Sequence, residues 1–151
     1  MKKIFSKLKY LVLPLLVGGI VGFIISKFIQ YDNLNKPFLS PPQLAFPIVW
    51  TILYILMGIS FGILGEKNLL DSKSKFLYYF QLLINALWSI FFFVFEWRLF
   101  AFIWIILLDI VVIFMTINFY KKNKLAGLLQ IPYIIWILFA TYLNLAFYLL
   151  N

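Results

Sequence analysis

The sequence predicts an all-α integral membrane protein, a bundle of five transmembrane helices that forms a single domain over residues 1–151. Hydrophobic residues make up 65% of the chain and charged residues only 12%, about half the charged fraction of a soluble domain. The apolar residues also form runs of about 20 residues, the length that a helix needs to cross the hydrocarbon core. These runs are expected at residues 10–29, 44–64, 76–95, 99–120 and 125–150.

The first two runs flank a segment rich in proline. Run 10–29 is too long for the core of a signal peptide, and no small-residue cleavage pattern follows it, so we expect a retained span. Segment 30–43 follows, and four of the eleven positions from Pro37 to Pro47 are proline. This density of proline excludes a helix interior. We expect a stiff loop that ends at the start of the second helix, where proline is tolerated in the first turn.

Short polar segments separate the remaining runs. A polar loop is expected at 66–75, a turn at 96–98 and a lysine-rich break at 121–124. The turn at 96–98 is so short that the third and fourth helices must be antiparallel neighbours. The fifth span is expected from residue 125 to about residue 150, with Pro132 near its beginning.

The basic residues predict the orientation of the bundle. With alternating spans, ten of the 13 lysines and arginines lie on the side of the N-terminus, and three lie on the other side, at Lys27, Lys36 and Arg98. The positive-inside rule then predicts a cytoplasmic N-terminus and a C-terminus outside, with the proline-rich loop on the outer side. The net charge of +8 therefore indicates membrane topology and not nucleic-acid binding.

Residue types that the chain lacks exclude several kinds of function. Without cysteine there is no disulfide, thiolate metal site or cysteine nucleophile. Without histidine the chain has neither the usual imidazole base nor the commonest metal ligand. We therefore expect no metal site and no required cofactor.

Three predicted helices each have one face that combines aromatic rings with a few polar or small residues, because positions i, i+3, i+4 and i+7 share a helix face. The faces consist of Phe46, Trp50 and Tyr54 in the second helix, Asn85, Trp88, Ser89 and Phe92 in the third, and Trp136, Phe139, Ala140, Leu143 and Asn144 in the fifth. This composition suits a pocket for a flat apolar ligand. Packing of the helices on one another, with asparagines bonding across helices, fits the same pattern.

Two further features leave their roles open. Asp109 falls near the middle of the fourth run, where a carboxylate is costly and no lysine or arginine lies at the same depth. We expect it to be protonated or bonded to an indole, hydroxyl or backbone group, in a structural role ahead of a proton relay. The pairs Gly18-xxx-Gly22 and Gly58-xxx-Gly62 permit close helix approach, either inside the bundle or in a homodimer.

Four motifs occur in order along the chain. They are Tyr31-x-x-Leu34-x-Lys36-Pro37-x-x-x-Pro41-Pro42, Val49-Trp50-x-x-Leu53-Tyr54-x-x-Met57-Gly58, Gln81-Leu82-x-x-Asn85-x-x-Trp88-Ser89-x-x-Phe92 and Pro132-Tyr133-x-x-Trp136-x-x-Phe139-Ala140-Thr141-x-Leu143-Asn144. Together they resemble the TspO/MBR family, the tryptophan-rich sensory proteins or translocator proteins, known in animals as the peripheral benzodiazepine receptor. The resemblance covers nearly the whole chain.

The resemblance implies a five-helix bundle in the cytoplasmic membrane of a bacterium, with a cavity under the 30–43 loop that binds porphyrins and other flat hydrophobic ligands. Carried over by position, the implied cavity residues are Trp50, Tyr54, Asn85, Trp88, Trp136, Ala140 and Leu143. Trp50 and Trp136 match the two tryptophans implicated in light-dependent porphyrin breakdown in bacterial members, so they are the catalytic candidates if the protein is photochemical. A protoporphyrin IX-like molecule is expected as a ligand.

The chain also departs from the family pattern. Leu39 and Gln30 stand where the family has loop tryptophans, which removes two rings from the expected lid. Tyr142 and Tyr148 are followed by no basic residue before Asn151, so the cholesterol-recognition pattern of animal members is absent. The third run lacks the small-xxx-small pattern linked to dimerisation in some bacterial relatives.

Three functions need the same predicted pocket. The first expectation is a sensor or regulator that binds tetrapyrroles, because the sequence shows no ordinary acid–base apparatus. The alternatives are a light-dependent porphyrin-degrading enzyme and a transporter of porphyrin or other hydrophobic solutes.

Overall fold

The structure, a computed structural model, describes residues 2–27 and 35–151, with side chains described from residue 8 onward. Its helices are α1 (Lys2–Ser26), α2 (Ala45–Glu66), α3 (Ser72–Ser89), the π-helical turn η2 (Ile90–Val94), α4 (Arg98–Lys122), α5 (Lys124–Leu128) and α6 (Ile131–Leu150). Counting α3 with η2 and α5 with α6, five helical segments are long and apolar enough to cross a membrane. The predicted all-α, five-span fold is therefore confirmed.

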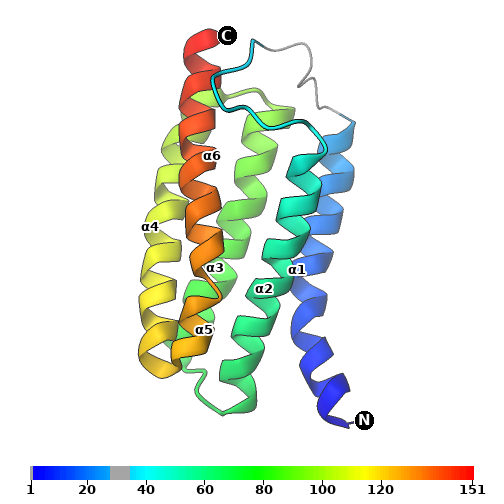
Figure 1. The fold of residues 1–151 in the computed structure, drawn as a ribbon, viewed down its shortest axis with the longest axis vertical. Coiled ribbons are helices and arrows are strands. Elements are labelled where there is room, and N and C mark those ends of the chain that lie inside the picture. The colour runs from blue at the N-terminus through cyan, green and yellow to red at the C-terminus, as the bar shows by residue number, and fades with distance from the viewer. Residues whose placement is uncertain (1, 28–34) are drawn as a thin grey trace.

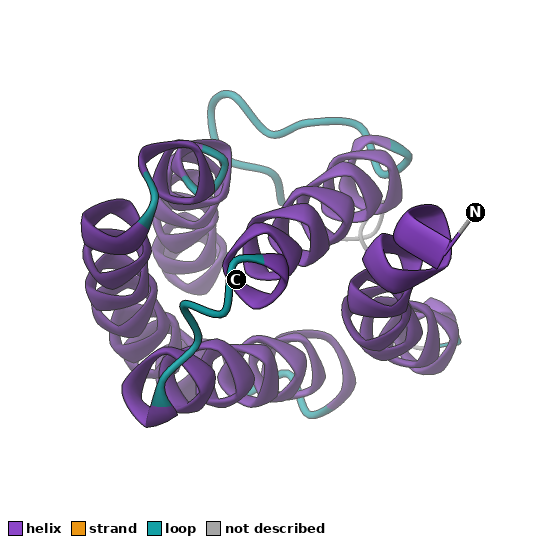
Figure 2. Cartoon of the chain, turned by 90° about the horizontal axis from the view of Figure 1, so that it is seen from below, coloured by secondary structure: helices purple, strands orange, loops and turns teal. Residues whose placement is uncertain are grey.

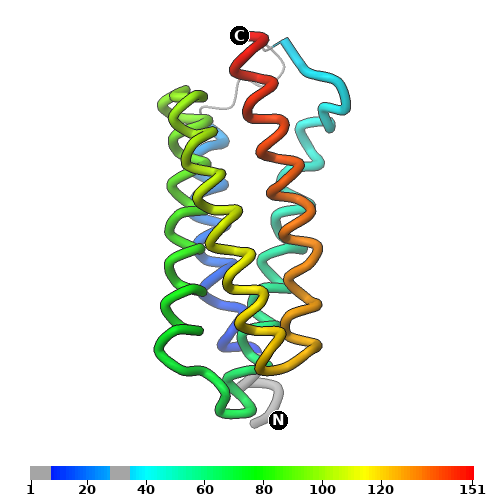
Figure 3. The backbone as a smooth tube through the Cα atoms, turned by 90° about the vertical axis from the view of Figure 1, so that its left-hand side faces the viewer, coloured from blue at the N-terminus to red at the C-terminus, as the bar shows by residue number. Residues whose placement is uncertain are grey.

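The helices lie side by side along the long axis of the molecule (Figures 1 and 3). The loop at residues 35–44 and the C-terminus lie at one end of the bundle, here called the loop end, and the start of α1 lies at the other, the N-terminal end. Viewed along the bundle, α1 lies at its edge (Figure 2). As expected, α3 and α4 are neighbours, and the backbone N–H of Trp97 closes their turn by donating to the Phe91 carbonyl at 2.9 Å.

The connection between α2 and α3 is shorter than the polar loop expected at 66–75. The Asp71 carboxylate accepts a 2.8 Å hydrogen bond from the backbone N–H of Ser74 and so caps α3, which begins at Ser72. Its other oxygen pairs with Lys122 Nζ at 2.9 Å. The Ser74 N–H, and after it Lys122, hold the pKa of Asp71 well below its usual range. Polar residues thus extend the third helix by one turn beyond the apolar run.

The fifth span, expected over 125–150, covers Lys124–Leu150 and consists of two helical segments. The short α5 ends at Leu128, and α6 restarts at Ile131 with Pro132 in its first turn. Proline has no backbone N–H, so it cannot continue the hydrogen bonding of the preceding helix but fits the start of a new one. The first helix also differs, since α1 begins at Lys2 and includes lysines ahead of the apolar run.

The two ends of the bundle are packed differently. Toward the N-terminal end, the Phe61 and Tyr78 rings stack with their centroids 4.0 Å apart, and both are buried. Met57, Leu64 and Ile137 are also buried. Large side chains therefore fill this half, and the cavity described next lies toward the loop end.

Candidate functional site

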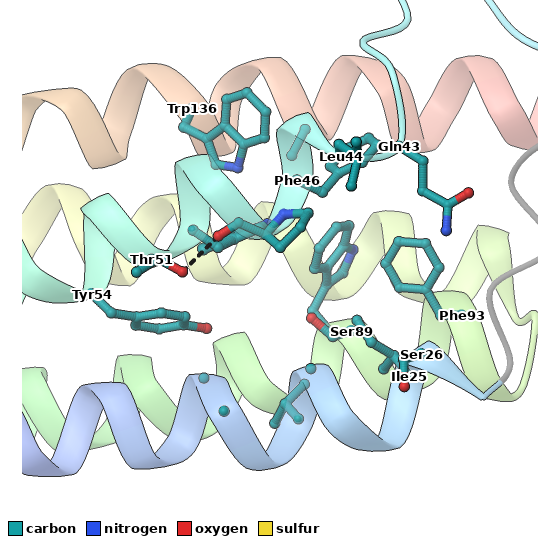
Figure 4. A pocket seen from close by; sticks show the side chains of 18 of the residues that line it. Ile25, Ser26, Gln43, Leu44, Phe46, Thr51, Tyr54, Ser89, Phe93 and Trp136 are labelled. Atoms are coloured by element: carbon teal, nitrogen blue, oxygen red, sulfur yellow. Dashed lines mark hydrogen bonds between the residues drawn. The ribbon is translucent and has the colours of Figure 1, made fainter.

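A cavity of about 470 Å³ lies between α1, α2, α3 and α6 (Figure 4). Ligand pockets in proteins measure roughly 300–1,000 Å³. Seven residues of the three predicted faces line this cavity: Phe46, Trp50, Tyr54, Trp88, Ser89, Trp136 and Ala140. Gln43 and Leu44, at the end of the proline-rich loop, contribute to its wall at the loop end.

Aromatic rings form one wall of the cavity, with Trp50 at the centre. The Trp50 ring stacks on Tyr54 at 5.7 Å between centroids and lies almost perpendicular to Trp136 at 6.4 Å. Trp88 lies 6.5 Å from the same ring, and Phe46 contacts Trp136 edge-on at 6.1 Å. The periodicity that places Phe46, Trp50 and Tyr54 on one face of α2 therefore produces a continuous aromatic surface.

A buried chain of hydrogen bonds fixes Tyr54 at the deep end of the cavity. The Tyr54 hydroxyl donates to Asn85 Oδ1 at 2.9 Å, and Asn85 Nδ2 donates to the Tyr133 hydroxyl at 2.7 Å. Tyr133 in turn donates to Gln81 Oε1 at 2.7 Å. Asn85 was predicted to line the pocket, but it lies behind Tyr54 and orients it. The Tyr54 hydroxyl has used its hydrogen, so toward a ligand it can only accept.

Trp88 is held in a similar way from α6. Its indole N–H donates to Asn144 Oδ1 at 2.9 Å, and Asn144 Nδ2 donates to the Arg98 carbonyl at 2.8 Å. Phe92 stacks on Trp88 at 5.6 Å between ring centroids. Asn144 and Phe92, both predicted site residues, thus support the cavity wall without lining it.

Two more predicted residues lie outside the lining. Phe139 packs on the Trp136 ring at 5.7 Å between centroids, and Leu143 is buried in the core. In the loop, Leu39 is exposed and does not line the cavity, and its φ of 69° lies in the left-handed region. Gln30 lies outside the described residues.

Sequence reasoning missed the wall that α1 provides. The lining includes Leu15, Gly18, Gly19, Val21, Gly22, Ile25 and Ser26 of α1, together with Pro47, Thr51 and Phe93. The sequence feature that marks this wall is the Gly18-xxx-Gly22 pair, which we interpreted as helix packing. Gly18 does pack closely, since a Cβ there would lie 2.5 Å from the Tyr54 ring, but a Cβ on Gly19 or Gly22 would meet no atom within 4 Å.

The chemistry of the lining is apolar with a few polar atoms. The described lining residues include no carboxylate and no lysine or arginine. The Thr51 hydroxyl donates to the Pro47 carbonyl at 2.6 Å and is already used. The Trp136 indole N–H has no hydrogen-bond partner among the described residues. Such a site can stack a flat apolar molecule and offer it a small number of hydrogen bonds.

Comparison with known proteins gives consistent matches along the chain. A sequence model of the TspO/MBR family matches residues 10–149. The tryptophan-rich protein TspO of Archaeoglobus fulgidus is 42% identical over 149 residues, which cover 96% of this chain and 97% of the relative. The tryptophan-rich sensory protein of Cereibacter sphaeroides is 34% identical over 76% of this chain and 72% of its own. The human translocator protein is 30% identical over 81% of this chain and 78% of its own.

Proposed function

This chain belongs to the TspO/MBR family of membrane proteins, and on that premise we propose that it binds tetrapyrroles and similar flat hydrophobic molecules in the cavity between α1, α2, α3 and α6. We further propose that binding makes it a sensor or regulator of the tetrapyrrole or stress response. The protein would lie in the cytoplasmic membrane of a bacterium, with its N-terminus in the cytoplasm.

The arrangement of rings around Trp50 is the observation that supports this proposal. Trp50 and Trp136 lie at 88° to each other on the cavity wall, so a planar ligand can lie on the face of one and meet the edge of the other. The Tyr54 hydroxyl offers an acceptor, as a pyrrole N–H requires, and Ser89 adds a hydroxyl at the wall. The names of two relatives, a sensory protein and a translocator protein, agree with a role that depends on ligand binding.

The test is quenching of tryptophan fluorescence by protoporphyrin IX, measured in the dark on purified protein in detergent. We expect saturable quenching, and we expect Trp50→Ala to weaken binding by about 10- to 100-fold because it removes a large apolar contact. Trp97→Phe is the matched control, since Trp97 is exposed and does not line the cavity. Quenching that does not saturate would overturn the proposal.

A light-dependent degrading activity is the second candidate, favoured by the adjacent indoles of Trp50 and Trp136 on the cavity wall. In that reaction, molecular oxygen would be the oxidant and the excited porphyrin the molecule oxidised. Illumination of the same samples should then yield a new absorbing product, which Trp136→Phe abolishes while dark binding persists. Porphyrin flux into proteoliposomes that depends on the protein would instead favour transport.

A further inference from the structure

We infer that the ligand reaches the cavity sideways from the lipid bilayer, through an opening between the loop-end halves of α1 and α2. This α1–α2 opening is bordered by Leu15, Gly19, Gly22 and Ser26 on α1 and by Pro47 and Thr51 on α2. The inference rests on the proposed function for its ligand, but its geometry stands on the described residues alone.

On α1, the surface that lines the cavity continues directly into the surface that faces lipid. Successive residues of a helix are about 100° apart, so Val21, Gly22 and Phe23 mark three directions around α1. Val21 is buried, Gly22 lines the cavity but is exposed, and Phe23 is 66% exposed on the outside. Gly19 also lines the cavity and is exposed. Among the described residues of α1, none that is buried lies between the side lining the cavity and the outer side of the helix at this border.

The facing side of α2 shows the same order. Tyr54 is buried, and Thr51 and Ile48 lie about 60° and 120° further around α2. Pro47 and Thr51 also line the cavity, yet both are exposed, and beside them Ile48 is 60% exposed on the outside. The cavity wall therefore ends on both helices at residues that are exposed.

The glycines show where α1 and α2 touch, as Gly18 does against the Tyr54 ring, and where α1 borders open space. At Gly58, near the N-terminal end of the contact, a Cβ would lie 2.7 Å from Leu11 Cδ2 and 2.8 Å from the Tyr10 carbonyl oxygen. At Gly19 and Gly22 a Cβ would meet nothing within 4 Å.

Between these regions lies Pro14, which cannot donate the backbone hydrogen bond of the helix interior. The loop-end half of α1 is thus joined to its packed half by a weakened turn.

Over its described residues, 35–44, the loop is held against α6 by hydrogen bonds. The backbone N–H of Asn35 donates to Asn151 Oδ1, and Asn151 Nδ2 donates to the Asn35 carbonyl, each at 3.1 Å. The Tyr142 hydroxyl donates to the Phe38 carbonyl at 2.6 Å. Entry from water past this part of the loop would break these bonds, whereas entry through the α1–α2 opening breaks none of them.

The surface of the opening also suits a ligand dissolved in lipid. Its members are apolar or small, and the Thr51 hydroxyl is occupied by the Pro47 carbonyl. We therefore assign the ligand to the class of flat amphiphiles that partition into the leaflet at the loop end.

Because the chain has no cysteine, single labels can test the opening without any porphyrin. A spin label on Thr51→Cys in nanodiscs should collide readily with oxygen and poorly with a water-soluble nickel chelate, as a label on the lipid-facing Ile103→Cys does. A label on the exposed loop position Phe38→Cys provides the aqueous reference. Collision behaviour at Thr51→Cys like that at Phe38→Cys would overturn the inference, even if porphyrin binding is intact.

The second experiment measures release of preloaded protoporphyrin IX into acceptor vesicles in the dark. A cleavable thiol cross-linker joining Gly22→Cys to Thr51→Cys should slow release at least about tenfold, and cleavage should restore it. The matched cross-link, Asn35→Cys to Asn151→Cys, should leave the release rate within about twofold. Slow release with the loop cross-link and unchanged release with the α1–α2 cross-link would overturn the inference. Failure of porphyrin to bind the uncross-linked protein would contradict the proposed function, and the spin-label result would still decide the route.

Discussion

Asp109 lies on α4 and is buried against α6, where its Oδ2 is 2.7 Å from Thr141 Oγ1. Thr141 Oγ1 is also 2.7 Å from the Ile137 carbonyl. A threonine hydroxyl has one hydrogen, so it cannot donate to both oxygens. Both contacts become hydrogen bonds only if the Asp109 carboxyl is protonated and donates to Thr141. The structure thus gives the carboxyl a neighbouring hydroxyl as its partner, as the sequence led us to expect, and its structural role stays a prediction.

A protonated Asp109 predicts that its amide isostere is tolerated. Asp109→Asn keeps a donor toward Thr141 and should change the free energy of unfolding by less than about 0.5 kcal/mol, whereas Asp109→Ala should cost about 1–2 kcal/mol. Unfolding in detergent, followed by tryptophan fluorescence, measures both. Equal destabilisation by the two variants would mean that the carboxyl is ionised.

Asn144 predicts a coupling between two helices at the cavity wall. It accepts from the Trp88 indole and donates to the Arg98 carbonyl, so Asn144→Leu leaves the indole N–H without its acceptor and removes a donor from that carbonyl. We expect a loss of about 1–2 kcal/mol in unfolding free energy and weaker porphyrin binding. A double-mutant cycle with Trp88→Phe should give a coupling energy of about 1 kcal/mol. Additive effects would show that the indole is held by packing alone.

At the scale of the helices, two glycine substitutions should have opposite results. Gly58→Ala drives a methyl group into Leu11 and the Tyr10 backbone, so we expect it to separate α1 from α2 and cost about 1–3 kcal/mol in unfolding free energy. Gly22→Ala meets open space and should be neutral or stabilising by up to about 1 kcal/mol, because alanine favours the helix. Thermal unfolding of both variants in one detergent decides this. Similar losses would contradict the separation of the two helices at the loop end.

The same glycines show what the sequence could predict and what it could not. Apolar run lengths and the positions of Phe46, Trp50 and Trp136 on helix faces are local properties, so both the spans and the aromatic wall were predictable. Which glycine meets another helix depends on how α1 crosses α2, and the sequence pattern is the same for Gly18-xxx-Gly22 and Gly58-xxx-Gly62. Asn85 and Asn144 illustrate the same limit, because periodicity gives their face but not whether a ring stands between them and the cavity.

For the whole molecule, the orientation of the bundle in the membrane decides which leaflet supplies the ligand. The turn at residues 67–71 and the junction of α4 with α5 lie at the N-terminal end, and the loop and the start of α4 lie at the other (Figures 1 and 3). Ten of the 13 basic residues belong to the N-terminal side by sequence. Lysines near helix ends oppose translocation, so we predict that the loop end faces outward and that the α1–α2 opening meets the outer leaflet.

Cysteine labelling in intact bacterial cells tests this orientation. A membrane-impermeant maleimide should label Phe38→Cys, which is 81% exposed at the loop end, without any permeabilisation. Ser72→Cys, exposed at the N-terminal end, should react only after the membrane is opened. The lipid-facing Ile110→Cys, 48% exposed on α4, should stay unlabelled in both conditions and controls for reagent leakage. Labelling of Ser72→Cys alone in intact cells would mean that the bundle has the opposite orientation and that a porphyrin enters from the inner leaflet.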